Sequence, residues 1–129
     1  SVPLLNFHYI DSNPFKINNL EIIPIEVFHG NLPMVGFRIQ NFAYITDASV
    51  LPESEYAKLE NLDVLILNAL RIRPHPTHFS LEESVQAAKR INAKQTYFTH
   101  MTHDLMHDTT NELLPPNIQL GYDGLSFEI

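Results

Sequence analysis

The sequence predicts a mixed α/β domain built from layers of strands and helices. The first half of the chain reads as β-strands, because apolar and β-branched residues run together there without helical spacing. The second half alternates strand-like apolar runs with segments of helical periodicity, as layered α/β folds do. The chain has 129 residues, of which 44% are hydrophobic and 18% are charged. We therefore expect residues 1–129 to form a single globular domain.

Three strands are expected in the first half. Residues 21–28 are apolar and β-branched, and Pro24 within them favours an edge position or a bulge. Residues 34–39 and 42–46 are predicted to form a hairpin that is closed by the Gln-Asn dipeptide between them. Asp47 follows the last of these strands directly.

The second half is expected to open with a short helix over 53–60. Pro52 suits a first helical turn, and acidic residues stand near the start of the segment, where the helix dipole favours them. The nearly continuous apolar run 63–69 predicts a buried strand, and 95–99 predicts a further one.

A helix over 81–92 is the strongest local prediction. Ser80 and Glu83 have the spacing of a capping box, in which each side chain bonds the backbone of the other. Apolar residues then recur at spacings of four, three and three, which places them on one helical face. They are Leu81, Val85, Ala88 and Ile91.

One more helix and two closing strands are expected near the C-terminus. The helix spans 104–114 and is stopped by the two prolines that follow it. Short strands at 117–121 and 124–129 are expected to be joined by an Asp-Gly turn.

Composition and charge exclude several classes of protein. The chain has 15 acidic and 8 basic residues, and its net charge of -7 repels polyanions such as nucleic acids. It has no cysteine, which excludes disulfides, zinc–thiolate sites and cysteine nucleophiles. No apolar run approaches the roughly 18 residues of a membrane span, and no signal peptide opens the chain. We expect a cytoplasmic protein that does not bind membranes.

The chain holds seven histidines, and most of them follow predicted strands or lie in loops. Side chains at the carboxyl ends of strands converge at one edge of an α/β sheet, where ligands bind. Histidine nitrogen and carboxylate oxygen suit Zn, Mn or Fe, and two such cations can activate a water for phosphoester cleavage. The pattern therefore predicts a metal site from these strand-end and loop residues: His29, Asp47, His75, His78, His100 and His103.

Each of these residues also has a structural interpretation. A single histidine at a strand end is more often a capping or surface residue than a metal ligand. Asp47 before Ala-Ser could simply start a turn. His103 and His107 share a helical face, but no glutamate follows His103 to make a zincin motif. His or Asp residues follow four predicted strands, and this coincidence favours the metal-site interpretation over the structural one.

Five segments resemble the metallo-β-lactamase-fold hydrolases, most closely the branch of ribonuclease Z and the phosphonate-pathway cyclic phosphodiesterase. The resemblance spans about residues 21–129, and its third and fourth segments are the most specific. The segments are Val-Phe-His-Gly with Met-Val-Gly-Phe-Arg-Ile; Tyr-Ile-Thr-Asp-Ala; Leu-Ile-Leu-Asn-Ala-Leu-Arg with Pro-His-Pro-Thr-His-Phe-Ser; Tyr-Phe-Thr-His-Met-Thr-His-Asp; and Gly-Tyr-Asp-Gly-Leu.

The resemblance implies two divalent transition metals and a role for each matching residue. His29 looks like the histidine that completes the shell of one metal, Asp47 like the bridging carboxylate, and His100 like the last ligand of the second metal. His78, and less closely His75, look like the loop histidine that contacts phosphate and protonates the leaving oxygen. Three further residues are candidate substrate contacts: His103, which lies near His100 in the sequence, and Arg71 and Arg73, which flank the histidine loop.

One departure from the family pattern is large. Members begin with a His-x-His-x-Asp-His motif that supplies most of the metal ligands, and residues 1–28 hold only His8 and Asp11. We therefore expect the chain to be the C-terminal half of an αββα sandwich and to be inactive alone, binding metal weakly or not at all. Such a half would expose the inner face of its sheet, so we expect a homodimer or another association through that face.

The resemblance and the acidic charge favour hydrolysis of a small or cyclic phosphodiester. Two alternatives remain at this point. One is a member of the same fold that resembles the pyrroloquinoline-quinone pathway protein. The other is a degenerate, non-catalytic binding or assembly domain. Substrate choice in such folds resides in loops.

Overall fold

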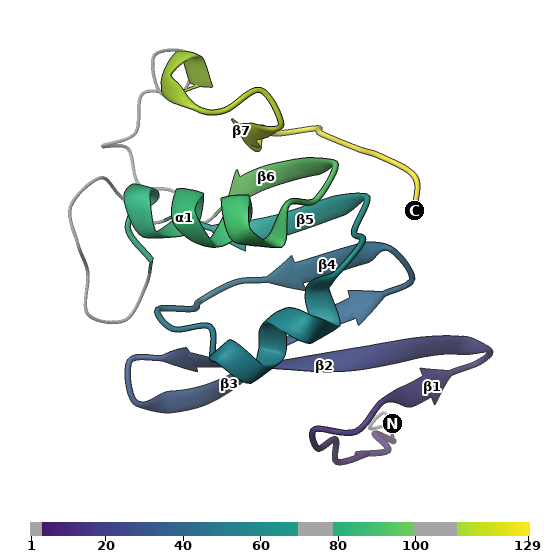
Figure 1. Cartoon of the computed structure of the whole chain (residues 1–129). Coiled ribbons are helices and arrows are strands. Elements are labelled where there is room, and N and C mark those ends of the chain that lie inside the picture. Colours follow the sequence, from purple (N-terminus) through teal and green to yellow (C-terminus); the bar gives the residue numbers. More distant parts are fainter. Residues whose placement is uncertain (1–3, 70–78, 100–110) are drawn as a thin grey trace.

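A computed structural model describes residues 4–69, 79–99 and 111–129, and it shows one mixed sheet with helices η1 and α1 on one face (Figure 1). The seven strands lie in the sheet in chain order. The predicted α/β class is confirmed. The strands are β1 (Phe15–Ile17), β2 (Leu20–His29), β3 (Leu32–Ile39), β4 (Phe42–Ile45), β5 (Val64–Asn68), β6 (Gln95–Thr99) and β7 (Ile118–Leu120), and the helices are η1 (Glu53–Leu59) and α1 (Leu81–Ile91).

The sheet changes from antiparallel to parallel at β4. Strands β1 to β4 pair antiparallel, whereas β4 to β7 pair parallel. The crossover from β4 to β5 contains η1, and the crossover from β5 to β6 contains α1. Strands β2, β4, β5 and β6 consequently run in the same direction and end at one edge of the sheet, on the left in Figure 1. That edge is where the sequence predicts convergent ligands.

The strands expected in the first half are confirmed, and one strand was missed. Strand β2 runs beside both β1 and β3, but β1 reaches only as far as Ile22, so Pro24 lies where β2 has lost that neighbour. The missed strand β1 turns into β2 through Asn18, whose φ of 56° lies in the left-handed region that asparagine tolerates better than most residues.

Helix α1 begins and ends as its sequence predicts. The Ser80 hydroxyl accepts from the Glu83 backbone N–H at 3.3 Å, and the Glu83 carboxylate accepts from the Ser80 backbone N–H at 3.0 Å. Asn92 ends the helix in a left-handed conformation with φ 54°. The predicted helix 53–60 is present as the 3-10 helix η1.

Replacing Ser80 with Ala is expected to lower the free energy of unfolding by about 1 kcal/mol, because it removes one half of the capping box. Chemical denaturation followed by circular dichroism measures this loss. Glu83→Gln keeps a side-chain acceptor for the Ser80 N–H and is the matched control. A loss in Ser80→Ala no larger than the loss in Glu83→Gln would contradict a specific contribution from the Ser80 hydroxyl.

The hydrophobic core fills the space between the helices and one face of the sheet. Its strand members alternate along each strand, as a half-buried sheet requires. Phe98 on β6 is the largest fully buried side chain. The other completely buried core residues of the strands are Ile25, Val27, Ala43, Ile45, Leu65 and Leu67.

The opposite face of the sheet is apolar and partly uncovered. Val35 on β3 is 43% exposed and Tyr44 on β4 is 47% exposed. The C-terminal tail crosses this face, and its Phe127 ring lies 5.9 Å from the Tyr97 ring and 5.5 Å from the Phe42 ring. The tail covers only part of this face. The apolar surface that remains exposed is larger than is usual for a sheet face that belongs to a packed core.

The expected closing strand 124–129 is wrong. Residues after β7 turn at Gly124, whose φ is 85°, and continue without strand pairing. The tail is held by aromatic contacts of Phe127 rather than by a backbone ladder. Strand 117–121 is confirmed as β7. Of the expected helix 104–114, only 111–114 lies in the described part of the chain, and residues 111–113 there are helical.

Within the described ranges, no helix is both long and apolar enough to cross a membrane.

Candidate metal centre

The candidate centre lies at the edge where β2 and β4 end. His29 is the last residue of β2, and Asp47 stands two residues after the end of β4. The two chain segments meet there because Phe28 forms an isolated antiparallel bridge with Val50. The topology therefore brings together two residues that lie 18 positions apart in the sequence.

The His29 ring is oriented by the backbone of Asp47. Its Nδ1–H donates a hydrogen bond to the Asp47 carbonyl oxygen at 3.1 Å, since a carbonyl can only accept. This bond selects the tautomer in which Nε2 carries a lone pair. Metal-binding histidines commonly use the same arrangement, with the second ring nitrogen bound to a backbone carbonyl or a carboxylate.

Asp47 adopts an uncommon backbone conformation. Its φ of 59° lies in the left-handed region, which aspartate and asparagine visit more readily than other residues with a Cβ atom. The reversal turns the chain away from the sheet directly after β4. The residue types alone would allow a simple turn at this position. The chain does bend here, and its backbone also holds the His29 ring.

Ser49 ties the loop after Asp47 to both neighbours of His29. Its hydroxyl donates to the Phe28 carbonyl at 3.1 Å and accepts from the Gly30 N–H at 3.0 Å. Its backbone N–H also donates to the Phe28 carbonyl at 2.7 Å. These bonds hold the end of β2 against the loop.

Asn68, the last residue of β5, holds the same loop from the other side. Its side-chain oxygen accepts from the Ala48 N–H at 3.0 Å, and its side-chain nitrogen donates to the Ala48 carbonyl at 2.9 Å. Asn68 is completely buried. The sequence analysis did not select Asn68 as a functional residue. The available signal was a single amide at the end of an otherwise apolar strand, because a buried polar group needs hydrogen-bond partners.

The other predicted site residues lie outside the described part of the chain. This holds for one metal ligand, both loop histidines and all three candidate substrate contacts: His100, His75, His78, His103, Arg71 and Arg73. Strands β5 and β6 nevertheless end at the same edge. Their ends lie side by side there, since the Ala69 N–H, just after β5, donates to the carbonyl of Thr99, the last residue of β6, at 2.9 Å. Among the described residues there is no group of three or more histidine, cysteine or acidic side chains that could hold a metal ion. His29 and Asp47 are thus the two members of the predicted set that the structure places together.

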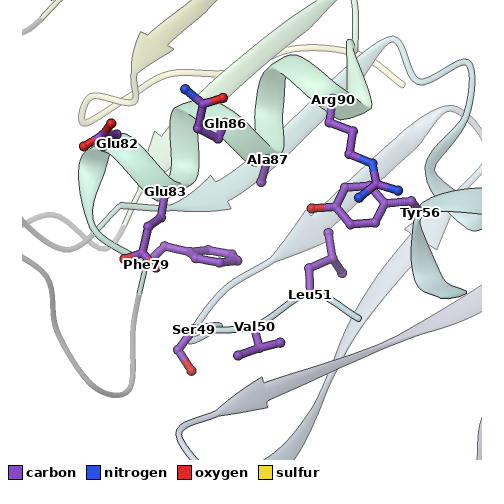
Figure 2. Close-up of a pocket in the computed structure, with 10 residues that line it drawn as sticks. All are labelled: Ser49, Val50, Leu51, Tyr56, Phe79, Glu82, Glu83, Gln86, Ala87 and Arg90. Carbon is purple, nitrogen blue, oxygen red and sulfur yellow. The ribbon is translucent and has the colours of Figure 1, made fainter. Parts of the chain in front are cut away.

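A groove on the helix face is distinct from the candidate centre. It has a volume of about 650 Å³, its walls come from α1, η1 and the loop 49–51, and it contains no histidine (Figure 2). Arg90 lies 3.7 Å above the centre of the Tyr56 ring and forms an ion pair with Glu53. The hydrogen bond from Arg90 lowers the pKa of Glu53, and burial raises the pKa of Tyr56. Arg90, the basic residue of this groove, is therefore already engaged by Glu53 and Tyr56.

Comparison with known proteins gives one family and several relatives. Residues 3–101 match the family described as "Beta-lactamase superfamily domain". A crystal structure of a diphosphatase from the PhnP family superimposes with a TM-score of 0.92 and 43% sequence identity, covering 95% of this chain and 48% of that one. Zn²⁺-bound PqqB from Methylobacterium extorquens shares the fold with a TM-score of 0.70, 15% identity, and coverage of 92% of this chain and 54% of that one.

A curated relative is much longer than this chain. The protein named octanoyltransferase from Porphyromonas gingivalis is 33% identical over 114 residues, which are 87% of this chain and 23% of the relative. The chain thus spans about a quarter of that relative and about half of each solved structure.

Proposed function

The chain belongs to the metallo-β-lactamase superfamily, and from this premise we propose that it forms part of a metal-dependent hydrolase that cleaves a small or cyclic phosphodiester. The observation that carries the proposal is the hydrogen bond from His29 to the Asp47 carbonyl. It places two ligand-type side chains, an imidazole and a carboxylate, together at the strand edge. The remaining ligands of a complete site come, in this proposal, from His100 and from a segment outside this chain.

The two described residues fit a divalent metal by their donor chemistry. His29 offers an imidazole nitrogen on a ring that the Asp47 carbonyl orients, and Asp47 offers carboxylate oxygen. Zn²⁺ and Mn²⁺ accept both donors. The zinc in the PqqB relative supports a transition metal without selecting one. We propose that His29 and Asp47 hold part of a two-metal centre.

When bound, two divalent cations would supply an activated water and would stabilise the leaving oxygen of a phosphoester. The residues of this chain hold and orient the reactants. His29 keeps its ring fixed through the Asp47 carbonyl. We further propose that His78, with His75 beside it, donates a proton to the leaving oxygen, and that Arg71, Arg73 and His103 bind the phosphate group.

A phosphate ester is favoured over other substrates by the most similar solved structure reported above. That protein is a diphosphatase from the PhnP family, and it shares 43% of its aligned residues with this chain. The net charge of -7 disfavours a long polyanionic substrate. We therefore propose a small substrate with one phosphodiester or diphosphate linkage.

The assay that tests this function uses the intact protein from its source, loaded with Zn²⁺ or Mn²⁺. Bis(p-nitrophenyl) phosphate, a cyclic ribose phosphodiester and a dinucleotide-type diphosphate are offered as substrates. Hydrolysis of at least one, lost on chelation and restored by metal, is the expected result. Metal-independent background rates for all three would leave the degenerate binding domain as the better interpretation.

A second candidate function is hydrolysis of an acyl thioester, and the long relative favours it. The name of that relative is octanoyltransferase, and a segment 33% identical to this chain forms 23% of it. Hydrolysis of such a thioester adds water across the C–S bond and gives a carboxylic acid and a thiol. Two divalent cations, when bound, would supply the activated water. Including an octanoyl thioester in the same assay separates the two functions, because only one class of substrate should be turned over efficiently.

Self-association of the chain alone is a further proposal, and it follows from the partly uncovered sheet face. Val35 and Tyr44 stand on that face, 43% and 47% exposed. Light scattering after size exclusion is expected to show dimers or larger species at micromolar concentration, and Val35→Lys with Tyr44→Lys is expected to reduce them. Lys16→Glu on the terminal strand β1 is the matched control for a charge change. A monomer in the unmodified chain would contradict this proposal.

A further inference from the structure

We propose that Asn68 is a positioning residue for the metal centre, acting through the backbone of the loop that carries Asp47. The inference rests on the proposed function, because it takes the Asp47 carboxylate as a metal ligand. It adds a residue on β5 that touches neither metal nor substrate.

The Asn68 side chain continues the sheet at the point where β4 leaves it. The last backbone pair between β4 and β5 is Ile45 with Leu67. One residue later on β5, the Asn68 amide takes over: its oxygen accepts from the Ala48 N–H at 3.0 Å and its nitrogen donates to the Ala48 carbonyl at 2.9 Å. The Asn68 side chain thereby holds both the backbone N–H and the backbone carbonyl of Ala48.

The clamp acts on the residue directly after Asp47. With φ at 59°, Asp47 needs its surroundings to maintain a conformation that the isolated chain seldom adopts. Ala48 is completely buried and also accepts from the Phe79 N–H at 2.8 Å. The peptide that follows Asp47 is held through the Ala48 N–H by Asn68 and through the Asp47 carbonyl by His29, and the next peptide is held through the Ala48 carbonyl. These bonds restrict the direction in which the Asp47 side chain leaves the backbone.

Asn68 is itself held in place, as a positioning residue must be. It is completely buried, and its backbone carbonyl accepts from the Ser84 hydroxyl of α1. Aspartate lacks the N–H that bonds the Ala48 carbonyl, and leucine lacks both groups. Only an amide of this length supplies the donor and the acceptor together.

Zinc affinity of the intact protein, measured by competition with a chromophoric chelator, tests the inference. Asn68→Asp and Asn68→Ala are each expected to weaken binding about 10- to 100-fold, as loss of a residue that orients a ligand does. Asn68→Ala introduces no charge and keeps the test readable should Asn68→Asp fail to fold. Wild-type affinity in a folded Asn68→Ala variant would overturn the inference.

Two controls separate positioning from general stability. Leu65→Ala creates a cavity on the same strand, and Thr96→Val removes the buried hydroxyl of β6, which has no hydrogen-bond partner among the described residues. Both are expected to stay within about 3-fold of the wild-type zinc affinity, less than the loss typical of an orienting residue. If Leu65→Ala weakened zinc as much as Asn68→Ala, the positioning role would be wrong.

Asp47→Asn distinguishes this inference from the proposed function. It is expected to weaken zinc binding at least as much as the Asn68 variants do. Weak binding in Asp47→Asn with normal binding in Asn68→Ala would refute the positioning role alone. Normal binding in Asp47→Asn would refute the assignment of Asp47 as a ligand, and the role of Asn68 with it.

Discussion

Replacing His29 with Ala is expected to lower the zinc affinity of the intact protein by at least about 100-fold, since even residues that only orient a ligand cost 10- to 100-fold. The substitution removes the imidazole nitrogen that the Asp47 carbonyl orients. In the proposed mechanism the loss of metal also removes the hydrolytic activity, so both quantities should fall together. Isothermal titration and the phosphodiester assay measure them.

His8→Ala is the matched control for the His29 variant. His8 lies on the exposed N-terminal segment that precedes β1. Its removal changes the histidine count by the same amount and should leave zinc affinity and turnover unchanged. A His29→Ala protein that binds zinc as the wild type does would contradict the assignment of His29 as a ligand.

Replacing Phe98 with Ala is expected to lower the free energy of unfolding by about 3–5 kcal/mol, the usual cost of truncating a buried aromatic residue. Phe98 lies on β6 and is completely buried between the sheet and the helices. A domain of this size is commonly stable by about 5–15 kcal/mol, so the loss is a large part of the total. Urea denaturation followed by circular dichroism measures it.

Phe7→Ala removes the same side chain from an exposed position and controls for the loss of an aromatic residue. Phe7 is 79% exposed, so its replacement should change the free energy of unfolding by less than about 0.5 kcal/mol. If the Phe98 and Phe7 variants had equal stability, β6 would not be a central strand of a packed core.

Most of the fold could be predicted from the sequence because its signals are local. Capping residues and helical periodicity locate α1, and continuous apolar runs locate β5 and β6. Strand β1 was missed because three residues carry too little pattern to predict a strand. The tail 124–129 alternates as a strand does, but pairing depends on a neighbouring strand, and local sequence does not supply one.

The candidate site could be predicted only in part, for a related reason. His29 and Asp47 were found because residues at strand ends share an edge when their strands run in the same direction. The Asp47 carbonyl as the partner of the His29 ring could not be predicted, because a backbone contact leaves no signature in residue types. Asn68 was missed because its clamp joins β5 to a loop 20 residues earlier.

Anomalous diffraction from crystals of the intact protein grown with Zn²⁺ tests the central claim most directly. Two zinc peaks are expected at the edge where β2 and β4 end. One or both should lie about 2.0–2.2 Å from His29 Nε2 or an Asp47 carboxylate oxygen, the usual ligand distances for zinc. Zinc bound elsewhere, or a fully folded protein with no zinc near His29 and Asp47, would contradict the account.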